Sequence, residues 1–239
     1  MQIKLRFSGQ NILLPMASQY PIQGLLYRLL SGAPGYASFL HDTGYRREKK
    51  VFRLFTFGPP EGHYLRREKQ LLYPEGFRLE VRSCDPMFIQ AMLQGTAQDR
   101  DCRLCGNALR LEDVRLEDRR IHTGAVRVRM RSPITVHTTL PDGFTRYHTP
   151  EEEVFYAAIA DNAAEKWRAM YRQEPPGPLQ MASCGGAHPK TVTTYKGNYI
   201  TGYGGSFQLG GDPALLDLLY NAGLGGKNAQ GFGMFDPVK

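Results

Sequence analysis

The 239-residue sequence has few cysteines, and their spacing does not complete a metal-binding pattern. Four are present, and two of them, Cys102 and Cys105, have the C-x-x-C spacing of half a zinc site. A second Cys or His pair with matching spacing is missing from the sequence, and His122 stands alone. The sequence therefore predicts free thiols, no bound metal and no cofactor.

Long apolar runs and a secretory signal pattern are also missing. No run approaches the roughly 18 consecutive apolar residues of a membrane-spanning helix. The N-terminal segment does not have a charged stretch followed by an apolar one, which is the pattern of a signal peptide. We therefore expect a soluble, cytoplasmic protein without membrane association.

Acidic residues are outnumbered by basic ones. The sequence has 30 Lys and Arg against 23 Asp and Glu, which gives a formal net charge of +7 and a pI near 9.3. A positive field of this kind attracts polyanions such as nucleic acid. Many basic proteins bind no nucleic acid, so the charge alone favours this class of partner only modestly.

Glycine, in contrast, is concentrated near the C-terminus. Five glycines fall within residues 223–233, directly after an amphipathic helical pattern. Glycine weakens ordinary helices and strands, so such a run indicates left-handed backbone angles or another molecule packed on the main chain. A Walker loop would need Gly at 221 and Ser or Thr at 228, and both positions are Asn. A glycine C-cap with a tight turn explains one or two of the five. We therefore expect a phosphate backbone to lie against this glycine-rich loop.

The order of the predicted elements indicates an α+β fold with two tandem ferredoxin-like domains. Residues 2–7 alternate polar and apolar like a half-buried strand, and helical patterns follow at 20–31 and 34–42. Strand patterns at 50–57 and 76–82, a helix opened by Asp85-Pro86 and a strand near 108–117 complete the order. The order β-α-β-β-α-β is that of a ferredoxin-like, RNA-recognition-like domain, which we assign to residues 1–118.

The second half repeats this order over residues 119–239. A strand through 125–138 leads to a helix that is expected to begin at Thr149-Pro150 and to end near Tyr171, because a threonine N-cap, proline and a capping-box Glu coincide there. Strands near 179–184, 190–200 and 203–209, a helix opened by Asp212-Pro213, the glycine-rich loop and a strand at 231–236 close the unit. The duplication lies in the order of elements and not in repeated sequence.

Together these features resemble the endoribonucleases that process CRISPR repeat RNA, within the wider superfamily of repeat-associated RNA-binding proteins. The resemblance runs nearly end to end. It rests on residues 19–27 (QYPIQGLLY), 39–41 (FLH), 50–52 (KVF), 132–134 (SPI) and 223–233, the glycine-rich loop. The loop is the strongest marker, whereas the short segments count through their order.

The resemblance implies metal-independent cleavage of CRISPR repeat RNA in a precursor transcript. In this reaction a ribose 2′-OH attacks its own 3′ phosphate and leaves a 2′,3′-cyclic phosphate and a 5′-OH. The chemistry requires a base, an acid and donors that stabilise the charge of the phosphorane. The positions that match the family motif are Tyr27, His41 and Lys50. We assign His41 as the principal proton-transfer residue and Tyr27 as its partner.

The residues themselves allow these roles without requiring them. Tyr27 is on the flank of an apolar helical stripe, from which it can meet a ligand. His41 closes a helical pattern, and a helix C-terminus stabilises an imidazolium. A tyrosine that covers the core and a histidine in a simple dipole contact are the ordinary alternatives. Lys50 follows a run of other cations, so Lys49 could take its role.

Basic side chains and the glycine-rich loop are the candidate RNA-binding residues. Arg127, Arg129 and Arg131 alternate with apolar residues, so we expect them on one strand face, where they could follow a phosphate backbone or simply be solvated. The complete set is Arg46, Arg47, Lys49, Arg127, Arg129, Arg131, Lys190, Gly223, Gly225, Lys227, Gly231 and Gly233.

A second hypothesis is a non-catalytic RNA-binding subunit of an RNA-guided effector complex, because it would use the same folds and the same loop. His41 in its motif context favours the enzyme, since a protein that only binds RNA needs no proton donor there. The sequence leaves open the repeat that is bound, whether that repeat forms a stem-loop, whether the protein is a homodimer, and which effector complex receives the product.

Overall fold

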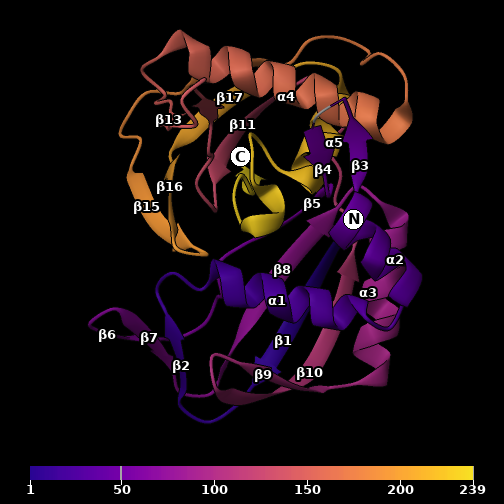
Figure 1. Cartoon of the computed structure of the whole chain (residues 1–239), viewed down its shortest axis with the longest axis vertical. Helices are drawn as coiled ribbons and strands as arrows, with labels where there is room; N and C mark the ends of the chain where they lie inside the picture. Colours follow the sequence, from indigo (N-terminus) through magenta and orange to yellow (C-terminus); the bar gives the residue numbers. More distant parts are fainter. Residues whose placement is uncertain (49, 239) are drawn as a thin grey trace.

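Two antiparallel sheets, each with its own pair of helices, form the framework of the protein (Figure 1). The computed structural model describes residues 1–48 and 50–238. The first sheet has the strand order β5-β8-β1-β10-β9, and the second has the order β14-β17-β11-β18. Within both, the four core strands follow the same sequence of neighbours, which is that of the ferredoxin-like fold. The expected α+β class with two such units is therefore confirmed.

The N-terminal unit contains the first sheet and the helices α1 and α3. β1 pairs antiparallel with both β8 and β10, and β5 pairs with β8 at the edge. The bounds are β1 (Gln2–Ser8), α1 (Gln19–Leu30), β5 (Phe55–Phe57), β8 (Gly76–Ser83), α3 (Pro86–Gln98), β9 (Asp101–Leu104) and β10 (Asn107–Glu117). The apolar stripe of α1 is buried as predicted, and it consists of Ile22, Leu25, Leu26, Leu29 and Leu30.

Short elements are inserted around this sheet. β2 (Ile12–Pro15), β6 (Leu65–Arg67) and β7 (Gln70–Tyr73) form a small sheet of their own. The helical pattern at 34–42 is divided into α2 (Pro34–Ser38) and the π-helix η1 (Phe39–Thr43), and the chain then enters the hairpin of β3 (Tyr45–Arg47) and β4 (Lys50–Phe52). The expected single strand at 50–57 is thus wrong, because Leu54 has a φ of +52° and separates β4 from β5.

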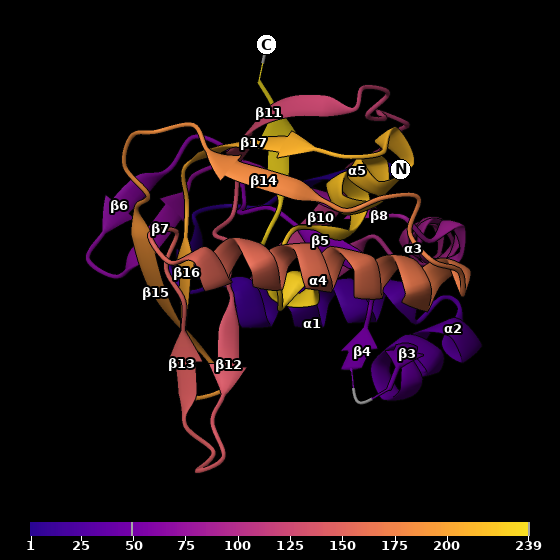
Figure 2. The same ribbon diagram turned by 90° about the horizontal axis from the view of Figure 1, so that it is seen from above.

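The C-terminal unit contains the second sheet, with α4 and α5. Its elements are β11 (Ala125–Met130), α4 (Glu153–Tyr171), β14 (Gln180–Ser183), β17 (Ser206–Gly210), α5 (Pro213–Ala222), the short 3₁₀ helix η2 (Asn228–Gln230) and β18 (Phe235–Pro237). Two hairpins extend from this unit (Figure 2), namely β12 (His137–Thr139) with β13 (Thr145–Tyr147) and β15 (Lys190–Tyr195) with β16 (Asn198–Tyr203). The expected strand at 125–138 is therefore two strands in different sheets.

The start of α4 differs from the expected one. Thr149 and Pro150 form a turn, in which the amide of Glu152 donates to the carbonyl of Thr149 at 3.0 Å, and the helix begins at Glu153. The Glu152 side chain does not reach back to cap the helix, because it pairs with Nδ1 of His148 at 2.8 Å. The capping-box prediction is wrong because this contact draws the glutamate towards the β12–β13 hairpin.

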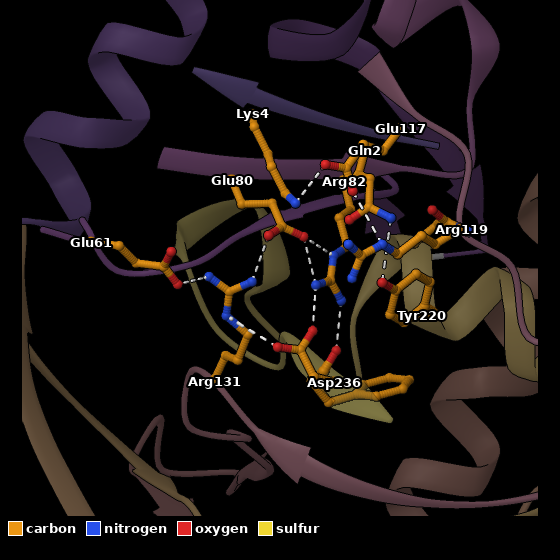
Figure 3. Close-up of polar contacts among 12 residues, drawn as sticks. Gln2, Lys4, Glu61, Glu80, Arg82, Glu117, Arg119, Arg131, Tyr220 and Asp236 are labelled. Carbon is orange, nitrogen blue, oxygen red and sulfur yellow. Dashed lines mark hydrogen bonds and ion pairs between the residues drawn. The ribbon is translucent and has the colours of Figure 1, made fainter. Parts of the chain in front are cut away.

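A buried ion network connects the two sheets (Figure 3). Arg82 of β8 has a side chain that is 1% exposed, and it donates to Glu80 at 2.6 Å, to the carbonyl of Phe235 at 2.6 Å and to Asp236 at 2.5 Å. Arg131, just beyond β11, donates to the other oxygen of Glu80 at 2.6 Å. Burial would raise the pKa of Glu80, but the two guanidinium groups outweigh it and hold that pKa below its usual value.

The network also includes Arg131, which we expected among the RNA-binding residues and which forms ion pairs within the protein. Its side chain is 15% exposed and additionally pairs with Glu61 and with Asp236. Its charge is therefore compensated inside the protein, whereas Arg127 and Arg129 on β11 are exposed. Since α5 also contacts β5 and β8 of the first sheet, the division of the chain at 118/119 stays a prediction.

Candidate active site

A cleft of about 1000 Å³ between the two units brings together the three expected catalytic side chains and two of the expected RNA-binding residues. Its wall is formed by α1, the end of η1, β4, α4 and the glycine-rich loop. The cleft brings together Tyr27, His41, Lys50, Gly225 and Lys227, which come from positions as far apart as 200 residues along the chain. Three of these were assigned to catalysis and two to RNA binding from the sequence.

Tyr27 is half-buried on the flank of α1, as the helical pattern predicts. Its ring packs edge-on against the ring of His41, with the centroids 5.8 Å apart and an interplanar angle of 87°. Burial raises the pKa of Tyr27, and Arg53 acts in the opposite direction through its charge and hydrogen bonding. The phenol is therefore protonated at neutral pH and can donate a hydrogen bond.

His41 lies in the last turn of η1, with a side chain that is 73% exposed. Its Nδ1 is 2.6 Å from Oδ1 of Asp42. Because a carboxylate only accepts, this contact assigns the proton to Nδ1 and leaves Nε2 free to exchange a proton with a ligand in the cleft. A π-helical turn widens the backbone locally and is common at functional sites.

Arg53 is the cation that sequence reasoning missed. It is half-buried, follows β4 directly, and its Nη2 donates to the backbone carbonyl of His41 at 2.9 Å. Since it also acts on the Tyr27 phenol, it contacts both proposed proton-transfer residues. The available signal was a single basic residue within the apolar segment 51–55. Lys50, in contrast, is exposed on the β3–β4 hairpin and reaches the cleft from its rim.

The other expected RNA-binding cations are spread over the surface. Arg46 and Arg47 are exposed on β3, and Nε of Arg47 is 3.8 Å from Glu165 of α4. Lys49 lies outside the described residues. Arg127, Arg129 and Lys190 are exposed, but they are not among the described residues that line the cleft.

Most of the glycine-rich loop is packed inside the protein, with the left-handed backbone angles that the glycine run indicates. Gly223, Gly225, Gly231 and Gly233 are buried with φ between +63° and +86°. A Cβ at Gly225 would lie 2.8 Å from Ile134 and from the carbonyl of Thr135, and at Gly231 it would lie 2.8 Å from the ring of Phe57. Internal packing and left-handed angles already account for glycine at these four positions, and RNA contact there stays a prediction. Gly226 and Lys227 are the part of the loop that is partly exposed in the cleft.

Hydrogen bonds from the N-terminal unit hold the loop in place. The amide of Gln23 on α1 donates to the carbonyl of Ala229 at 2.6 Å, and the hydroxyl of Thr56 on β5 donates to that of Phe232 at 3.0 Å. These contacts fix Lys227, which has a φ of +55°, opposite Tyr27 and His41 across the cleft.

Lys166 of α4 holds the other side of the loop. It is 2% exposed, and its Nζ donates to the carbonyls of Gly223 at 2.6 Å and Gly225 at 2.9 Å. Burial lowers the pKa of Lys166 to about 7. A neutral amine still has two hydrogens, so both carbonyls remain satisfied after deprotonation.

The described residues were also compared with the patterns of a metal site and of a membrane-spanning helix. Within residues 1–48 and 50–238, His, Cys, Asp and Glu side chains do not converge in groups of three or more as they would around a metal ion. None of the helices in these residues has the length and apolar character needed to cross a membrane.

Comparison with known proteins identifies the family. Residues 116–237 match the sequence model described as "CRISPR associated protein Cas6, C-terminal". The chain belongs to the Cas6 family. It is 30% identical over 225 residues to the CRISPR-associated endoribonuclease Cas6 of Pyrococcus furiosus, with 92% of this chain and 82% of that protein covered. The resemblance inferred from sequence is thereby confirmed, and with it the expectation of an RNA-processing endoribonuclease.

Other Cas6 proteins agree with this result. The endoribonuclease Cas6 1 of Methanocaldococcus jannaschii is 25% identical over 251 residues, which cover 98% of this chain and 91% of that protein. A solved structure of a Cas6-related protein from P. furiosus has a TM-score of 0.86 at 16% identity, with 100% of this chain and 98% of that chain covered. This structural likeness supports the fold throughout the chain.

The packing of the loop predicts a large effect of alanine at one of its glycines and almost none at another. Gly231→Ala should destabilise the protein by roughly 2–4 kcal/mol, because it combines a left-handed φ with a contact to the Phe57 ring. Gly226→Ala is the matched control, since its Cβ would meet only the carbonyl of Thr135, at 3.5 Å, and the side chain of His137, at 3.9 Å, both ordinary contact distances; its stability should change by less than about 0.5 kcal/mol. Thermal melting and RNA binding should be measured together. A Gly231→Ala protein that melts normally yet loses RNA binding would show that the ligand lies on this glycine.

The low pKa of Lys166 predicts a specific pH dependence of stability. Between the folded value of about 7 and the ordinary value of 10.5, the unfolded chain binds a proton that the folded protein lacks, so stability rises with pH in this window. Lys166→Met removes this rise, at most about 1.4 kcal/mol per pH unit, as well as the two hydrogen bonds to the loop. Urea unfolding from about pH 7 to about pH 9 should therefore show a widening gap between the wild type and this variant. Lys190→Met, at an exposed lysine, should keep the wild-type slope; a constant gap for Lys166→Met would contradict the burial of an amine that loses its proton.

Proposed function

We propose that this protein cleaves CRISPR repeat RNA in the cleft by attack of a ribose 2′-OH on the adjacent phosphate, without a metal ion. The observation that carries the proposal is the contact of Tyr27 with His41, together with Arg53, which acts on both. These three side chains offer the groups that the reaction needs, and they lie in one cleft with Lys227.

Each side chain has a role that follows from its state. The O2′–P bond forms while the P–O5′ bond breaks, so one proton must leave O2′ and one must reach O5′. Nε2 of His41 accepts the proton that leaves O2′ and returns it to O5′, while Asp42 holds the Nδ1–H of the same ring. The protonated Tyr27 phenol donates a hydrogen bond to the reacting phosphate or to the departing oxygen. The guanidinium of Arg53 stabilises the extra negative charge of the phosphorane.

Lys50 and Lys227 are proposed to hold the RNA backbone rather than to take part in the chemistry. Both line the cleft, Lys50 from the exposed hairpin and Lys227 from the glycine-rich loop. Burial lowers the pKa of Lys227, yet a lysine that faces a phosphate regains the stabilisation of its charged form. Among the described residues, neither lysine forms a hydrogen bond with Tyr27 or His41, whereas Arg53 donates to the carbonyl of His41.

The reaction type is tested on the substrate. An RNA with hydrogen in place of the 2′-OH at the scissile nucleotide should bind normally and remain uncut, because the nucleophile is missing. The all-ribose RNA should be cut at the same rate with EDTA as with Mg²⁺, and its products should carry a 2′,3′-cyclic phosphate and a 5′-OH. Cleavage of the deoxy substrate, or loss of cleavage in EDTA with RNA binding intact, would sink the proposal.

The choice of Arg53 over Lys50 is tested by paired variants. Under single-turnover conditions, His41→Ala should slow cleavage by roughly 10²–10⁴-fold and Arg53→Met by roughly 10²–10³-fold, with little change in RNA affinity. Lys50→Met is the matched control, and it should weaken binding while slowing saturated cleavage by less than about tenfold. If the two methionine variants exchange these behaviours, Lys50 is the catalytic cation. If His41→Ala cleaves normally, a non-catalytic RNA-binding role or another base becomes the better account.

A further inference from the structure

A second hollow, which we call the hairpin groove, opens beside the proposed active site. It has a volume of about 600 Å³ and is formed mainly by the β12–β13 and β15–β16 hairpins, which extend together from the C-terminal unit (Figure 2). The groove and the cleft share part of their lining, namely His137, Tyr195, Lys196, Lys227 and Gln230. An RNA strand bound in the cleft can therefore continue directly into the groove, because the two hollows are adjacent.

Exposed aromatic rings are the main feature of the hairpin groove. The side chain of Tyr199 on β16 is 73% exposed, and that of Phe144 beside β13 is 64% exposed. The hydroxyl of Tyr147 donates to the backbone carbonyl of Tyr199 at 3.2 Å and so links the two hairpins. Tyr199 on a strand and Phe144 in the turn next to one leave large rings open to solvent, and such rings offer flat surfaces on which bases can stack.

The charges and polar groups of the groove favour the same class of ligand. Its described lining residues include Lys196 and Lys227 but neither Asp nor Glu. Two buried polar atoms, Nδ1 of His137 and Oε1 of Gln230, have no hydrogen-bond partner in the described part of the chain. Such atoms are costly to leave unpaired, so rotation of these two side chains towards a base edge in the groove would give them partners that the free protein lacks.

We propose that the hairpin groove binds unpaired nucleotides next to the scissile phosphate, with their bases stacked on Tyr199 and Phe144. The proposal rests on the proposed function and adds a recognition site to it. Unpaired nucleotides fit better than a duplex, because bases in a duplex stack on each other and their faces are not available to protein rings. The shared lysines explain how one backbone passes from the groove to the cleft.

The test uses a non-cleavable RNA with a 2′-deoxy scissile nucleotide, in which 2-aminopurine replaces each flanking base in turn. Stacking should quench its fluorescence at one or more flanking positions with the wild type and with Tyr199→Phe. Tyr199→Leu should lose this quenching and weaken RNA affinity by roughly fivefold to hundredfold. Tyr171→Leu is the control, because Tyr171 is also an exposed aromatic residue but lies at the C-terminal end of α4, whereas the β12–β13 hairpin precedes the N-terminal end of that helix. This variant should bind RNA like the wild type.

Pairing the flanking nucleotides with a complementary strand should weaken wild-type binding to the level of Tyr199→Leu. The proposal is overturned if Tyr199→Leu, shown by thermal melting to be folded, keeps both the affinity and the quenching, or if the paired RNA binds as well as the unpaired one. Cleavage of the all-ribose RNA is measured separately. If bases stack but the RNA is not cut, the groove proposal holds and the proposed cleavage is wrong. If the RNA is cut normally and Tyr199→Leu changes neither affinity nor quenching, the proposed cleavage holds and the groove proposal is wrong.

Discussion

The buried ion network between the sheets is the constraint on which the cleft depends. Arg82 binds Asp236 and the carbonyl of Phe235, and both belong to β18, which begins two residues after the glycine-rich loop ends. Removing charges from water is costly and is compensated only when every partner is in place. We infer that this requirement favours one position of β18 over others. Because β18 follows the glycine-rich loop, the same requirement fixes the C-terminal end of the loop, which packs against α1. The guanidinium of Arg82 also lies 4.1 Å from the ring centre of Tyr220, which ties α5 to the same position.

With its C-terminal end fixed in this way, the loop is held in place along its length and positions Lys227 in the cleft. Its four buried glycines pack against Ile134, Phe57 and the loop itself, while Lys166 and Gln23 bind its carbonyls from opposite sides. Lys227 is therefore held at a left-handed φ by contacts from both units, and its exposed neighbour Gly226 is the only loop glycine that is not at such an angle. The glycine density indicates a loop that fits between two units, and its cation, Lys227, lines the cleft and is the part that we propose to meet the RNA.

Hydrophobic periodicity made the scaffold predictable from the sequence. The buried stripe of α1 and the alternation in β1 depend on neighbours within a few residues, which the sequence displays directly. The differences lie where the backbone is irregular or where partners meet only in the folded chain. Leu54 takes a left-handed φ between two sheets, Arg131 pairs with Glu80 of the other unit, and Glu152 pairs with the nearby His148 and does not cap α4. Arg53 was missed for the same reason, because its contact with His41 is made by folding and not by spacing.

Three of the side chains in the proposed function lie on irregular backbone between the regular elements, whereas Tyr27 lies on the regular helix α1. His41 lies in a π-helical turn, Arg53 precedes the left-handed Leu54, and Lys227 is itself left-handed. Each conformation costs free energy and persists only because the surrounding packing enforces it. Two sheets of ordinary periodicity supply that packing, one for the proton-transfer residues and one for the loop cation. In the proposed reaction the N-terminal unit supplies the groups for the chemistry and the C-terminal unit supplies Lys227, which holds the RNA backbone, so the proposal needs both units to form the cleft.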